Sequence, residues 1–553
     1  MLIAAEGWET LCEGKAPGAL TSIMPAILQA RRWFGGKARR IESVTIVESI
    51  AVPSGSTKTL LLLIHVKYGD GAGETYQLPV TAAFGDEATR IQQDFPQAVI
   101  APLTVQRHGQ EAIGILYDAL WNRDFALALL DAIGQDSGFQ GIPGSLMASP
   151  TKAFGDLVSA GTLHEPAVMK AEQSNTSVAY GEQVILKFYR RLEEGMNQDL
   201  EIGRHLTNML FPYTPPIAGA IEYKRTSGEP ITLALLQKFV RNDGDAWRHS
   251  LDAVDRFFFR IVGGPLRDEP PPQTVHPLLN LARDEYPPLV RQLIGLYLES
   301  AERLGQQTAE LHVALSQVPD DPAFTPEPLT SKYRQARYDA AMRSTTGTFA
   351  LLQEREQLLS PAGQVHVRRL FDLRPELEHM FRAFRDLERP IPLIRCHGDY
   401  HLGQVLCTGS DFMIIDFEGE PARPLAERRM KQPAMVDVAG MVRSFHYAPF
   451  AFLQGKQAGI AVISHPIPSQ SLLWAQFWSD WASAAFLKAY LRIAAGAGFW
   501  PQDEGDVRLL LDLYLAEKAM YELGYELNNR PDWVEIPLHG LVSILETTRP
   551  RVP

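Results

Sequence analysis

One stretch of the sequence carries polar residues of the types and spacing needed to move a phosphoryl group. Asp399 lies in a His-Gly-Asp loop, Gln404 follows it closely, and Asp416 ends the apolar run 412–415. Phosphoryl transfer depends on positioning and charge neutralisation more than on covalent participation of the protein. Asp399 would accept a hydrogen bond from an acceptor hydroxyl, and the oxygens of Gln404 and Asp416 are hard ligands suited to Mg²⁺. The pattern predicts a kinase that uses ATP and Mg²⁺.

The His-Gly-Asp match is short, and an aspartate in a glycine turn is common in proteins of every kind. The amide at the right offset and the apolar run that ends in Asp416 make a chance match a poor explanation. We expect His397 to hold the catalytic loop through backbone hydrogen bonds and not to exchange protons. The role of His401 is left open. Asp437, further along the chain, is expected to cap a helix and to brace the same loop.

A lysine on a predicted strand is the candidate for holding the nucleotide phosphates. Residues 184–189 alternate in polarity, which places Lys187 on the face opposite the apolar side chains. Downstream, Asn197 can cap a helix, with Glu201 one turn inside it. In kinase folds a helix glutamate orients such a lysine. The alternative is a solvent-facing lysine with an exposed glutamate, but the motifs downstream favour the functional pair Lys187 and Glu201.

The loop that covers the phosphates is expected just before this strand, at residues 172–177. It lacks a glycine-rich pattern, so backbone amides assisted by hydroxyl groups would have to cradle the phosphates. The apolar run 231–240 would lead into the hinge whose backbone contacts adenine. The additional residues expected to bind nucleotide are Ser174, Asn175, Thr176, Gln237 and Phe239.

Tyrosines at helical spacing near the C-terminus are candidates for the acceptor site. Tyr514, Tyr521 and Tyr525 fall on one predicted helix, with Glu517 on a nearby face. Such an aromatic stripe is commonly part of a core. Sugars, however, are bound by flat aromatic faces combined with carboxylates and amides. From the residues alone the two interpretations are equally supported.

The composition is that of an ordinary globular protein. The chain has 553 residues, of which 45% are hydrophobic and 21% charged, and its net charge is −12. Nucleic-acid binding depends on clustered Lys and Arg, so we expect no nucleic-acid partner. The N-terminus turns acidic before a signal-peptide core develops, and no apolar run reaches the roughly 18 residues of a transmembrane helix. We therefore expect a cytoplasmic protein without a membrane partner.

The chain is longer than one hydrophobic core usually fills, so two or three domains are expected. Residues 1–115 show short alternating runs separated by turns, which predicts a small β-rich module. Residues 116–243 begin with a predicted helix near 117–121 and form the nucleotide-binding N-lobe. Residues 244–553 form a largely helical lobe with the catalytic loop and the acceptor site. The fold class is therefore α+β.

Several longer motifs resemble the maltokinase family. They are HGDYHLGQVL at 397–406, IIDFEGEPARPLAERR at 414–429, DVAGMVRSF at 437–445 and the Arg-Trp-Phe-Gly string that begins at Arg32. The resemblance implies a bilobal protein-kinase-like fold with an N-terminal cap domain over residues 1–115. It also implies transfer of the γ-phosphoryl group of ATP to the anomeric hydroxyl of maltose, giving maltose 1-phosphate for α-glucan and glycogen synthesis.

The same resemblance assigns further roles and partners. Tyr521 and Tyr525 would contact maltose, with Glu517 as a further candidate. Members of this family occur fused to trehalose synthase or encoded beside it, so trehalose synthase is an expected partner. Arg423 and Arg428 either neutralise phosphate charge or pair with neighbouring glutamates, and the sequence does not decide between these roles.

Two other functions are compatible with the sequence. One is a related kinase of another sugar, such as glucosamine, whose cap and catalytic motifs look alike. The other is a non-catalytic partner that binds trehalose synthase. The intact Asp399, Gln404 and Asp416 argue against the non-catalytic alternative.

Overall fold

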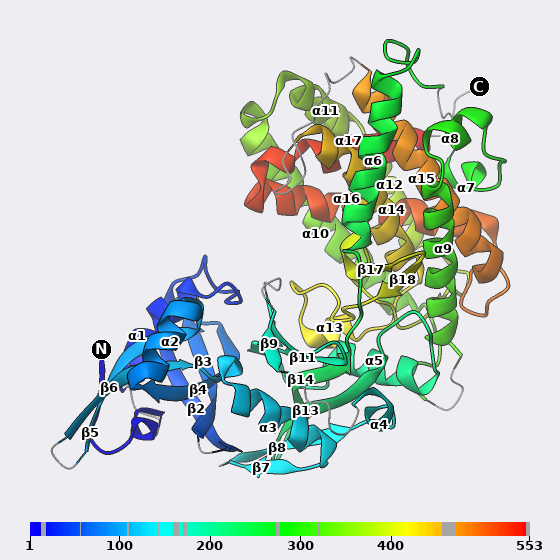
Figure 1. The fold of residues 1–553 in the computed structure, drawn as a ribbon. Helices are drawn as coiled ribbons and strands as arrows, with labels where there is room; N and C mark the ends of the chain where they lie inside the picture. Colours follow the sequence, from blue (N-terminus) through cyan, green and yellow to red (C-terminus); the bar gives the residue numbers. More distant parts are fainter. Residues whose placement is uncertain are drawn as a thin grey trace. The chain divides into compact units, whose positions relative to one another are not determined.

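The computed structural model (Figure 1) consists of two compact units, which are described separately. Unit 1 comprises Met1–Leu210 and Pro215–Arg241, and unit 2 comprises Phe211–Thr214 and Asn242–Pro553. The structure describes residues 1–12, 18–55, 57–107, 110–141, 143–158, 165–169, 174–272, 277–317, 321–455 and 470–548.

The first sheet of unit 1 is built from the N-terminal, β-rich part of the chain. Its strands run in the order β1, β5, β6, β4, β3, β2, and β12 pairs with β4. The bounds are β1 Leu2–Ala4, β2 Ile41–Ser54, β3 Thr57–Tyr68, β4 Gly73–Phe84, β5 Val99–Arg107, β6 Gln110–Asp118 and β12 Arg191–Leu192. Helix α1 (Ala19–Ala30) packs its buried side chains, Leu20, Met24 and Leu28, into the same core as this sheet. Helix α2 (Gly85–Asp94) lies near β4 and β6.

The predicted helix near 117–121 is wrong in its first two residues. Tyr117 and Asp118 end strand β6, and only Ala119–Trp121 form a helical turn, of the 3₁₀ type. Tyr117 is buried and pairs with Thr81 on β4, so cross-strand packing decides its conformation. The predicted domain boundary at 115 therefore falls inside a strand of the first sheet.

The second sheet of unit 1 carries the predicted nucleotide-binding residues. Its order is β7, β8, β13, β14, β11, β10, β9. The bounds are β7 Gly138–Gln140, β8 Gly144–Pro150, β9 Pro166–Val168, β10 Thr176–Tyr180, β11 Val184–Phe188, β13 Ile217–Arg225 and β14 Ile231–Lys238. Helix α3 (Arg123–Gly134) contributes Phe125, Leu129 and Ile133 to a core that side chains of both sheets share. Helix α5 (Gln198–Asn208) is capped by Asn197, whose side chain accepts a hydrogen bond from the Asp199 amide, as predicted for this cap.

Unit 2 is helical apart from short two-stranded pairs (Figure 1). Its long helices are α6 Ala246–Val262, α9 Tyr297–Ala314, α10 Ser331–Arg355, α11 Pro361–Asp372, α12 Arg374–Arg385, α14 Met435–Leu453, α15 Ser471–Ala494, α16 Glu504–Asn529 and α17 Glu535–Thr548. Helix α14 packs against α15, α16 and α6, and nearly all of its side chains are buried. Strands β17 (Val405–Thr408) and β18 (Asp411–Ile414) form the hairpin that follows the catalytic loop.

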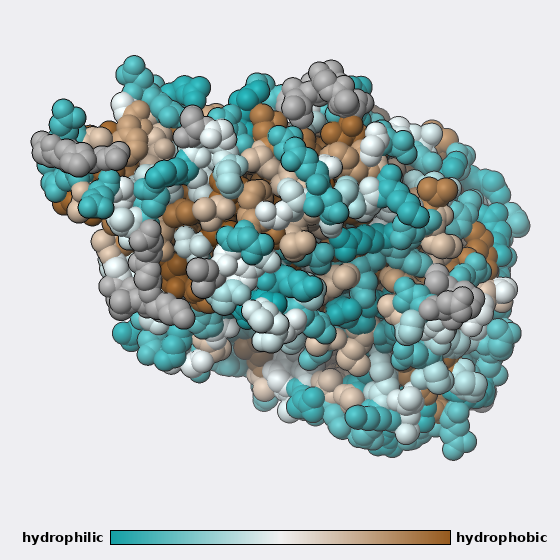
Figure 2. Space-filling view, turned by 90° about the horizontal axis from the view of Figure 1, so that it is seen from below, coloured by the Kyte–Doolittle hydropathy of each residue, from teal (hydrophilic) through white to brown (hydrophobic). Residues whose placement is uncertain are grey.

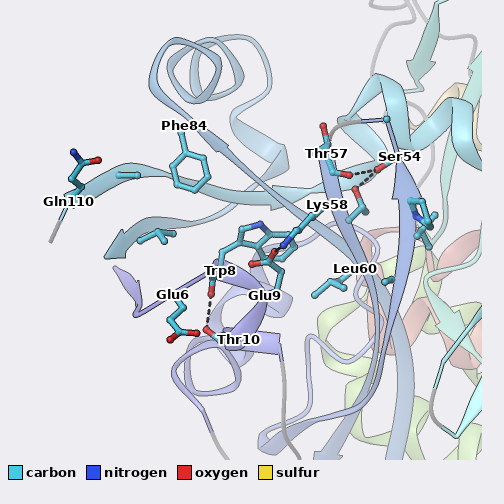
Figure 3. Close-up of a pocket in the computed structure, with 18 of the residues that line it drawn as sticks. Glu6, Trp8, Glu9, Thr10, Ser54, Thr57, Lys58, Leu60, Phe84 and Gln110 are labelled. Carbon is cyan, nitrogen blue, oxygen red and sulfur yellow. Dashed lines mark hydrogen bonds and ion pairs between the residues drawn. The ribbon is translucent and has the colours of Figure 1, made fainter. Parts of the chain in front are cut away.

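The surface shows two further features. In unit 1 an open groove runs between the N-terminal turn and the strands of the first sheet, with Trp8, Lys58, Phe84 and Gln110 along it (Figure 3). The face in Figure 2 is mostly hydrophilic, and its hydrophobic residues form several separate areas. Among the helices in the described ranges, none combines the length and apolar character needed to cross a lipid bilayer.

Candidate functional site

The predicted metal ligands lie together at the open end of a β-hairpin. Val405 on β17 pairs with Ile414 on β18, and the next residue, Ile415, donates its amide to the Gln404 carbonyl at 3.0 Å. This register brings Gln404 and Asp416 to the same end of the hairpin. Asp416 has a φ of 68°, which is unusual for a residue with a side chain. Such backbone strain is concentrated at functional sites.

These side chains have the donor chemistry that Mg²⁺ requires. One carboxylate oxygen of Asp416 and one of Glu418 lie within 4.8 Å of each other. Carboxylate and amide oxygens are hard ligands of the kind that bind Mg²⁺ alongside substrate phosphates. The residues present therefore fit a divalent cation, held by Asp416 with Gln404 and Glu418 nearby.

The predicted base, Asp399, faces a cation on one oxygen and an imidazole on the other. Lys518 Nζ lies 3.3 Å from Asp399 Oδ1, and His401 Nε2 lies 3.9 Å from Asp399 Oδ2. Burial opposes ionisation, but Lys518 and then His401 hold the pKa of Asp399 below its ordinary value. Asp399 is therefore a carboxylate at neutral pH and can accept a proton or a hydrogen bond.

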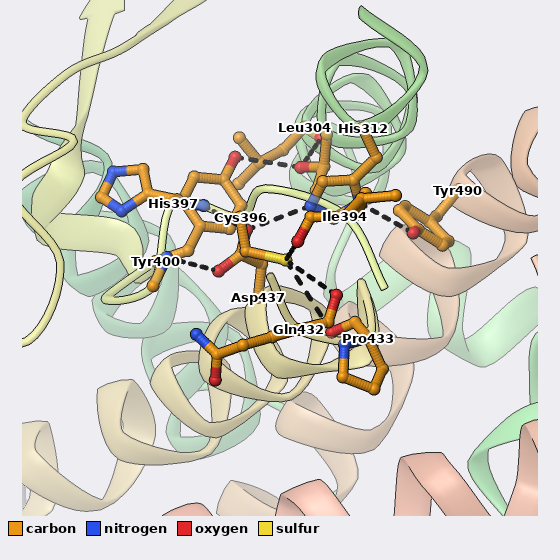
Figure 4. A network of polar contacts seen from close by, with 12 residues as sticks. Leu304, His312, Ile394, Cys396, His397, Tyr400, Gln432, Pro433, Asp437 and Tyr490 are labelled. Atoms are coloured by element: carbon orange, nitrogen blue, oxygen red, sulfur yellow. Dashed lines mark hydrogen bonds and ion pairs between the residues drawn. The ribbon is translucent and has the colours of Figure 1, made fainter. Parts of the chain in front are cut away.

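The backbone of the catalytic loop, residues 395–404, is braced by Asp437 in the first turn of α14. Its carboxylate accepts the amides of His397 at 2.7 Å and Gly398 at 2.9 Å, and it lies 3.1 Å from His312 Nε2. The hydroxyl of Tyr490 extends this hydrogen-bond network, since it lies 2.8 Å from His312 Nδ1 (Figure 4). Burial opposes the charge of Asp437, but the His312 hydrogen bond and nearby charge lower its pKa.

His397 is completely buried and holds the metal-ligand segment. Its Nε2 is 2.9 Å from the carbonyl oxygen of Ile415, the residue before Asp416. Its ring packs against those of Tyr400 and Phe417. His397 and Asp437 thus connect the catalytic loop to the segment that carries Asp416.

A pocket in unit 2 opens beside Asp399 and is lined by residues of helix α16. Tyr521 donates its hydroxyl to Glu420 Oε1 at 2.8 Å, and Glu517 pairs with Arg337 at 2.5 Å. Burial and the Glu420 carboxylate raise the pKa of Tyr521, so its hydroxyl stays protonated. Tyr525 stacks on Tyr521 with ring centroids 6.4 Å apart.

The tyrosine stripe therefore divides between the core and the pocket. Tyr514 is buried and contributes to the pocket wall, whereas Tyr521 and Tyr525 are 37% and 45% exposed. The exposed pair is available to a ligand, and neither residue is needed to fill the core.

Sequence reasoning missed Lys518 and Glu420 as site residues. Lys518 Nζ is 3.9 Å from Glu420 Oε2 and 5.3 Å from the centre of the Tyr521 ring. The only signal in the sequence was the spacing of Lys518 one helical turn before Tyr521. Lys518 contacts Asp399, which lies more than one hundred positions earlier in the sequence, so no local sequence pattern could indicate this contact.

For Arg428 the structure shows contacts with the backbone, in addition to the two roles left open by the sequence. Its guanidinium donates to the backbone carbonyls of Glu418 at 2.9 Å and Arg423 at 3.0 Å. Arg428 therefore stabilises the loop after Asp416. Arg423 lines the pocket beside Asp399.

On the nucleotide side, in unit 1, Lys187 contacts a carboxylate that was not among the predicted residues. Lys187 Nζ contacts Asp199 Oδ2 at 2.9 Å, and the Tyr189 hydroxyl donates to the same oxygen at 3.1 Å. The predicted partner, Glu201, lies two residues further along the same helix. Because each helical residue turns by about 100°, Asp199 and Glu201 project from opposite sides of α5. Asp199 is buried, and its carboxylate contacts Lys187 directly.

The other predicted nucleotide residues occupy the strands of the second sheet or their ends. Thr176 begins β10, and its buried hydroxyl accepts a hydrogen bond from Arg190 Nε at 2.9 Å, so this side chain is engaged within the protein. Ser174 is exposed and Asn175 is half-buried just before β10. The first residues of the predicted loop, 172 and 173, lie outside the described residues.

The predicted hinge residues lie at the end of β14. Gln237 pairs with Ile185 on β11, and the Phe239 amide donates to the Gln183 carbonyl at 2.9 Å. The Phe239 amide is therefore used within the protein. A nucleotide base would have to meet other backbone groups of this segment.

Comparison with protein families matches two segments of the chain. Residues 28–121 match the maltokinase N-terminal cap domain, and residues 290–459 match the phosphotransferase enzyme family. The fold and the site thus define a kinase-like phosphotransferase. Within this class the chain has the architecture of the maltokinase family, a maltokinase cap domain followed by a phosphotransferase domain. The predicted family and the predicted fold class, a kinase-like α+β fold with a β-rich cap, are confirmed.

Similar proteins of known name are glucosamine kinases. That of Streptacidiphilus jiangxiensis is 26% identical over 378 residues, covering 68% of this chain and 72% of the relative. That of Mycolicibacterium smegmatis is 25% identical over 440 residues, covering 78% of this chain and 91% of the relative. A glucosamine kinase structure superimposes with a TM-score of 0.63 at 18% identity over 98% of this chain and 100% of the other. A structure with glucosamine, ADP and phosphate gives a TM-score of 0.60 at 18% identity over 98% of this chain and 100% of the other.

Proposed function

We propose that the chain is an ATP- and Mg²⁺-dependent sugar kinase that phosphorylates the anomeric hydroxyl of maltose, giving maltose 1-phosphate and ADP. The observation that carries this proposal is the position of the ionised Asp399 on the wall of a pocket lined by aromatic and paired polar side chains. Such a lining suits a polyhydroxylated ligand, because flat rings pack on sugar faces and paired polar groups bind hydroxyls.

In this proposal the reaction is a single displacement at phosphorus. The acceptor hydroxyl oxygen forms a bond to the γ-phosphorus, and the bond from that phosphorus to the β,γ-bridging oxygen of ATP breaks. Asp399 accepts the hydroxyl proton. Mg²⁺ near Asp416 would neutralise phosphate charge when bound. Lys518 keeps the Asp399 carboxylate in place and maintains it in the ionised state before the transfer.

Charge pairing in the pocket supports a neutral acceptor over an amino sugar. The pocket lining holds three carboxylates, Asp399, Glu420 and Glu517, and an equal number of cationic side chains, Lys518, Arg337 and Arg423. An ammonium group would need a carboxylate that is not already neutralised, since a buried uncompensated charge is costly. Maltose brings only hydroxyl and ether oxygens. Tyr521, Tyr525 and Glu517 are the proposed contacts with this sugar.

The proposed nucleotide-binding residues lie in unit 1. Lys187, held by Asp199, would contact the phosphates in the manner of the kinase lysine. Ser174, Asn175, Gln237 and Phe239 stay predicted contacts through their side chains or backbone groups, and Glu201 also stays a prediction. Supply of maltose 1-phosphate to α-glucan synthesis, and association with trehalose synthase, are part of the proposal and rest on the family resemblance.

A screen of acceptors tests the proposed substrate. ADP release with ATP and Mg²⁺ is measured for maltose, glucose, trehalose and glucosamine at equal concentrations, with the Asp399→Asn variant as the blank. We expect maltose to give the highest kcat/KM. Turnover of glucosamine with maltose inert would overturn the maltose assignment and leave the kinase assignment intact. ADP release that is the same for the wild type and the blank would overturn both.

A further inference from the structure

His401 lies between the base and the predicted metal ligand, and the proposed reaction gives it no task. Its Nε2 lies 3.9 Å from Asp399 Oδ2, on the side of the carboxylate opposite Lys518. Its backbone carbonyl accepts the Gln404 amide at 2.9 Å. The same residue thus contacts the backbone that places Gln404 and faces the carboxylate that receives the acceptor hydroxyl.

The tautomer of His401 is fixed by its neighbour. The Gly403 amide donates to His401 Nδ1 at 3.0 Å. A ring nitrogen that accepts a hydrogen bond carries no proton, so a neutral imidazole at this position has its proton on Nε2. The Nε2–H group is the one directed towards Asp399.

The close approach of the ring to the backbone explains the glycine at 403. A Cβ added to Gly403 would lie 2.9 Å from Cε1 and 3.0 Å from Nδ1 of His401. Contacts this short would force the imidazole away from the Gly403 amide. Gly403 therefore allows the ring to lie over its own loop with Nε2 towards the carboxylate.

We propose that His401 is a positioning residue whose neutral Nε2–H group orients the Asp399 carboxylate for the acceptor hydroxyl. Lys518 holds Oδ1 and His401 polarises Oδ2, so rotation of the carboxylate out of its productive plane is opposed from both sides. Contacts of this kind are often long in the free enzyme and tighten when substrate binds. The inference rests on the proposed function, because it concerns the same base.

Variants that copy one ring nitrogen at a time separate this role from a purely structural one. In His401→Asn the amide oxygen can replace Nδ1 as the acceptor for the Gly403 amide, but the Nε2–H donor is lost. We expect kcat to fall about tenfold, with KM for both substrates within about twofold and an unchanged melting temperature. Gly403→Ala should lower kcat similarly by displacing the ring. Gly496→Ala is the control, because a Cβ there meets no described atom within 4 Å.

His401→Gln supplies the complementary variant. Its longer amide can place an N–H donor near the position of Nε2, so it should recover part of the turnover lost in His401→Ala. A His401→Asn variant with wild-type kcat would overturn the proposal and leave His401 as a loop cap alone. So would a His401→Gln variant no more active than His401→Ala.

A readout without substrate distinguishes failure of this inference from failure of the proposed function. Nitrogen NMR of protein labelled with ¹⁵N-histidine, with the His401 signal assigned from its loss in His401→Asn, reports the tautomer directly. We expect an unprotonated Nδ1 and a protonated Nε2 near neutral pH, and a shift of this signal in Asp399→Asn. A protonated Nδ1, or a signal that is indifferent to Asp399→Asn, would contradict the positioning role even if maltose is the acceptor.

Discussion

The catalytic loop and helix α16, which lines the proposed acceptor pocket, are stabilised in different ways. The loop is held by backbone amides bound to the buried Asp437, in a network that includes the fully buried His312 and His397. On α16 the pocket residues are held by pairs of side chains, and Tyr521 and Tyr525 are partly exposed. Groups that perform the transfer are thus fixed by the fold, whereas groups that would select the acceptor can be exchanged without disturbing the backbone. This difference explains how one architecture can serve kinases of different acceptors.

The largest effect on kcat is expected from substitution of the proposed base, Asp399. Asp399→Asn keeps the shape of the side chain but removes the proton acceptor, and kcat should fall about 10³-fold. Initial rates of ADP formation at saturating ATP measure the loss. Asp386→Asn, at an exposed carboxylate paired with Arg385, serves as the matched control and should retain full turnover. Wild-type turnover in Asp399→Asn would remove the catalytic assignment.

Asp437, which holds the backbone of the catalytic loop, should affect both stability and activity. Asp437→Asn leaves an amide group where the carboxylate accepts two backbone amides, and we expect a loss of about 3 kcal/mol in the free energy of unfolding. Urea unfolding monitored by circular dichroism measures this loss, and turnover should fall with it.

The pH dependence of this loss follows from the lowered pKa of Asp437. Because the folded-state pKa lies below the unfolded value of about 3.9, the stabilisation is present above that value. It is lost as the pH falls through the folded-state pKa. The stability difference between wild type and Asp437→Asn should therefore be constant from pH 7 to pH 5 and narrow towards pH 3. A difference that stays constant to pH 3 would show that the charge of Asp437 contributes nothing.

The nucleotide side offers a test of the two candidate carboxylates, Asp199 and Glu201, that could orient Lys187. Asp199→Asn should raise KM for ATP about tenfold, since the Lys187 ammonium loses the anion that orients it. Glu201→Gln, two residues along α5, is the comparison variant and should raise KM for ATP less than Asp199→Asn does. A larger increase in Glu201→Gln would assign the orienting role to Glu201 instead.

The smallest effect is expected at the acceptor pocket. Tyr521→Phe removes only the hydroxyl that donates to Glu420, a loss of about 1 kcal/mol. This corresponds to roughly a fivefold increase in KM for the sugar, with KM for ATP unchanged. An increase in KM for ATP instead would place Tyr521 on the nucleotide side of the reaction.

The sequence predicted the parts of the site that depend on local chemistry. The loop with Asp399 and Gln404 and the hairpin that ends at Asp416 are each contained in a short segment, so motif and spacing were sufficient. Asp199 was missed because the prediction used the usual position of a helix glutamate after a strand lysine in kinase folds, and sequence spacing does not show which helix residues are buried. Lys518 and Glu420 were missed because their contacts join segments that are distant in the sequence. Lys518 contacts both Asp399 and Glu420. Tyr117 was predicted to be helical together with residues 118–121, yet pairing with β4 keeps it in a strand.

The most direct test of the central claim is to identify the phosphorylated atom. Maltose labelled with carbon-13 at its reducing-end anomeric carbon is incubated with ATP, Mg²⁺ and the enzyme, and the product is examined by phosphorus and carbon NMR. The account predicts a phosphomonoester whose phosphorus couples to the labelled carbon, absent with Asp399→Asn. Phosphorylation at another carbon of maltose, or of glucosamine while maltose stays unmodified, would contradict it.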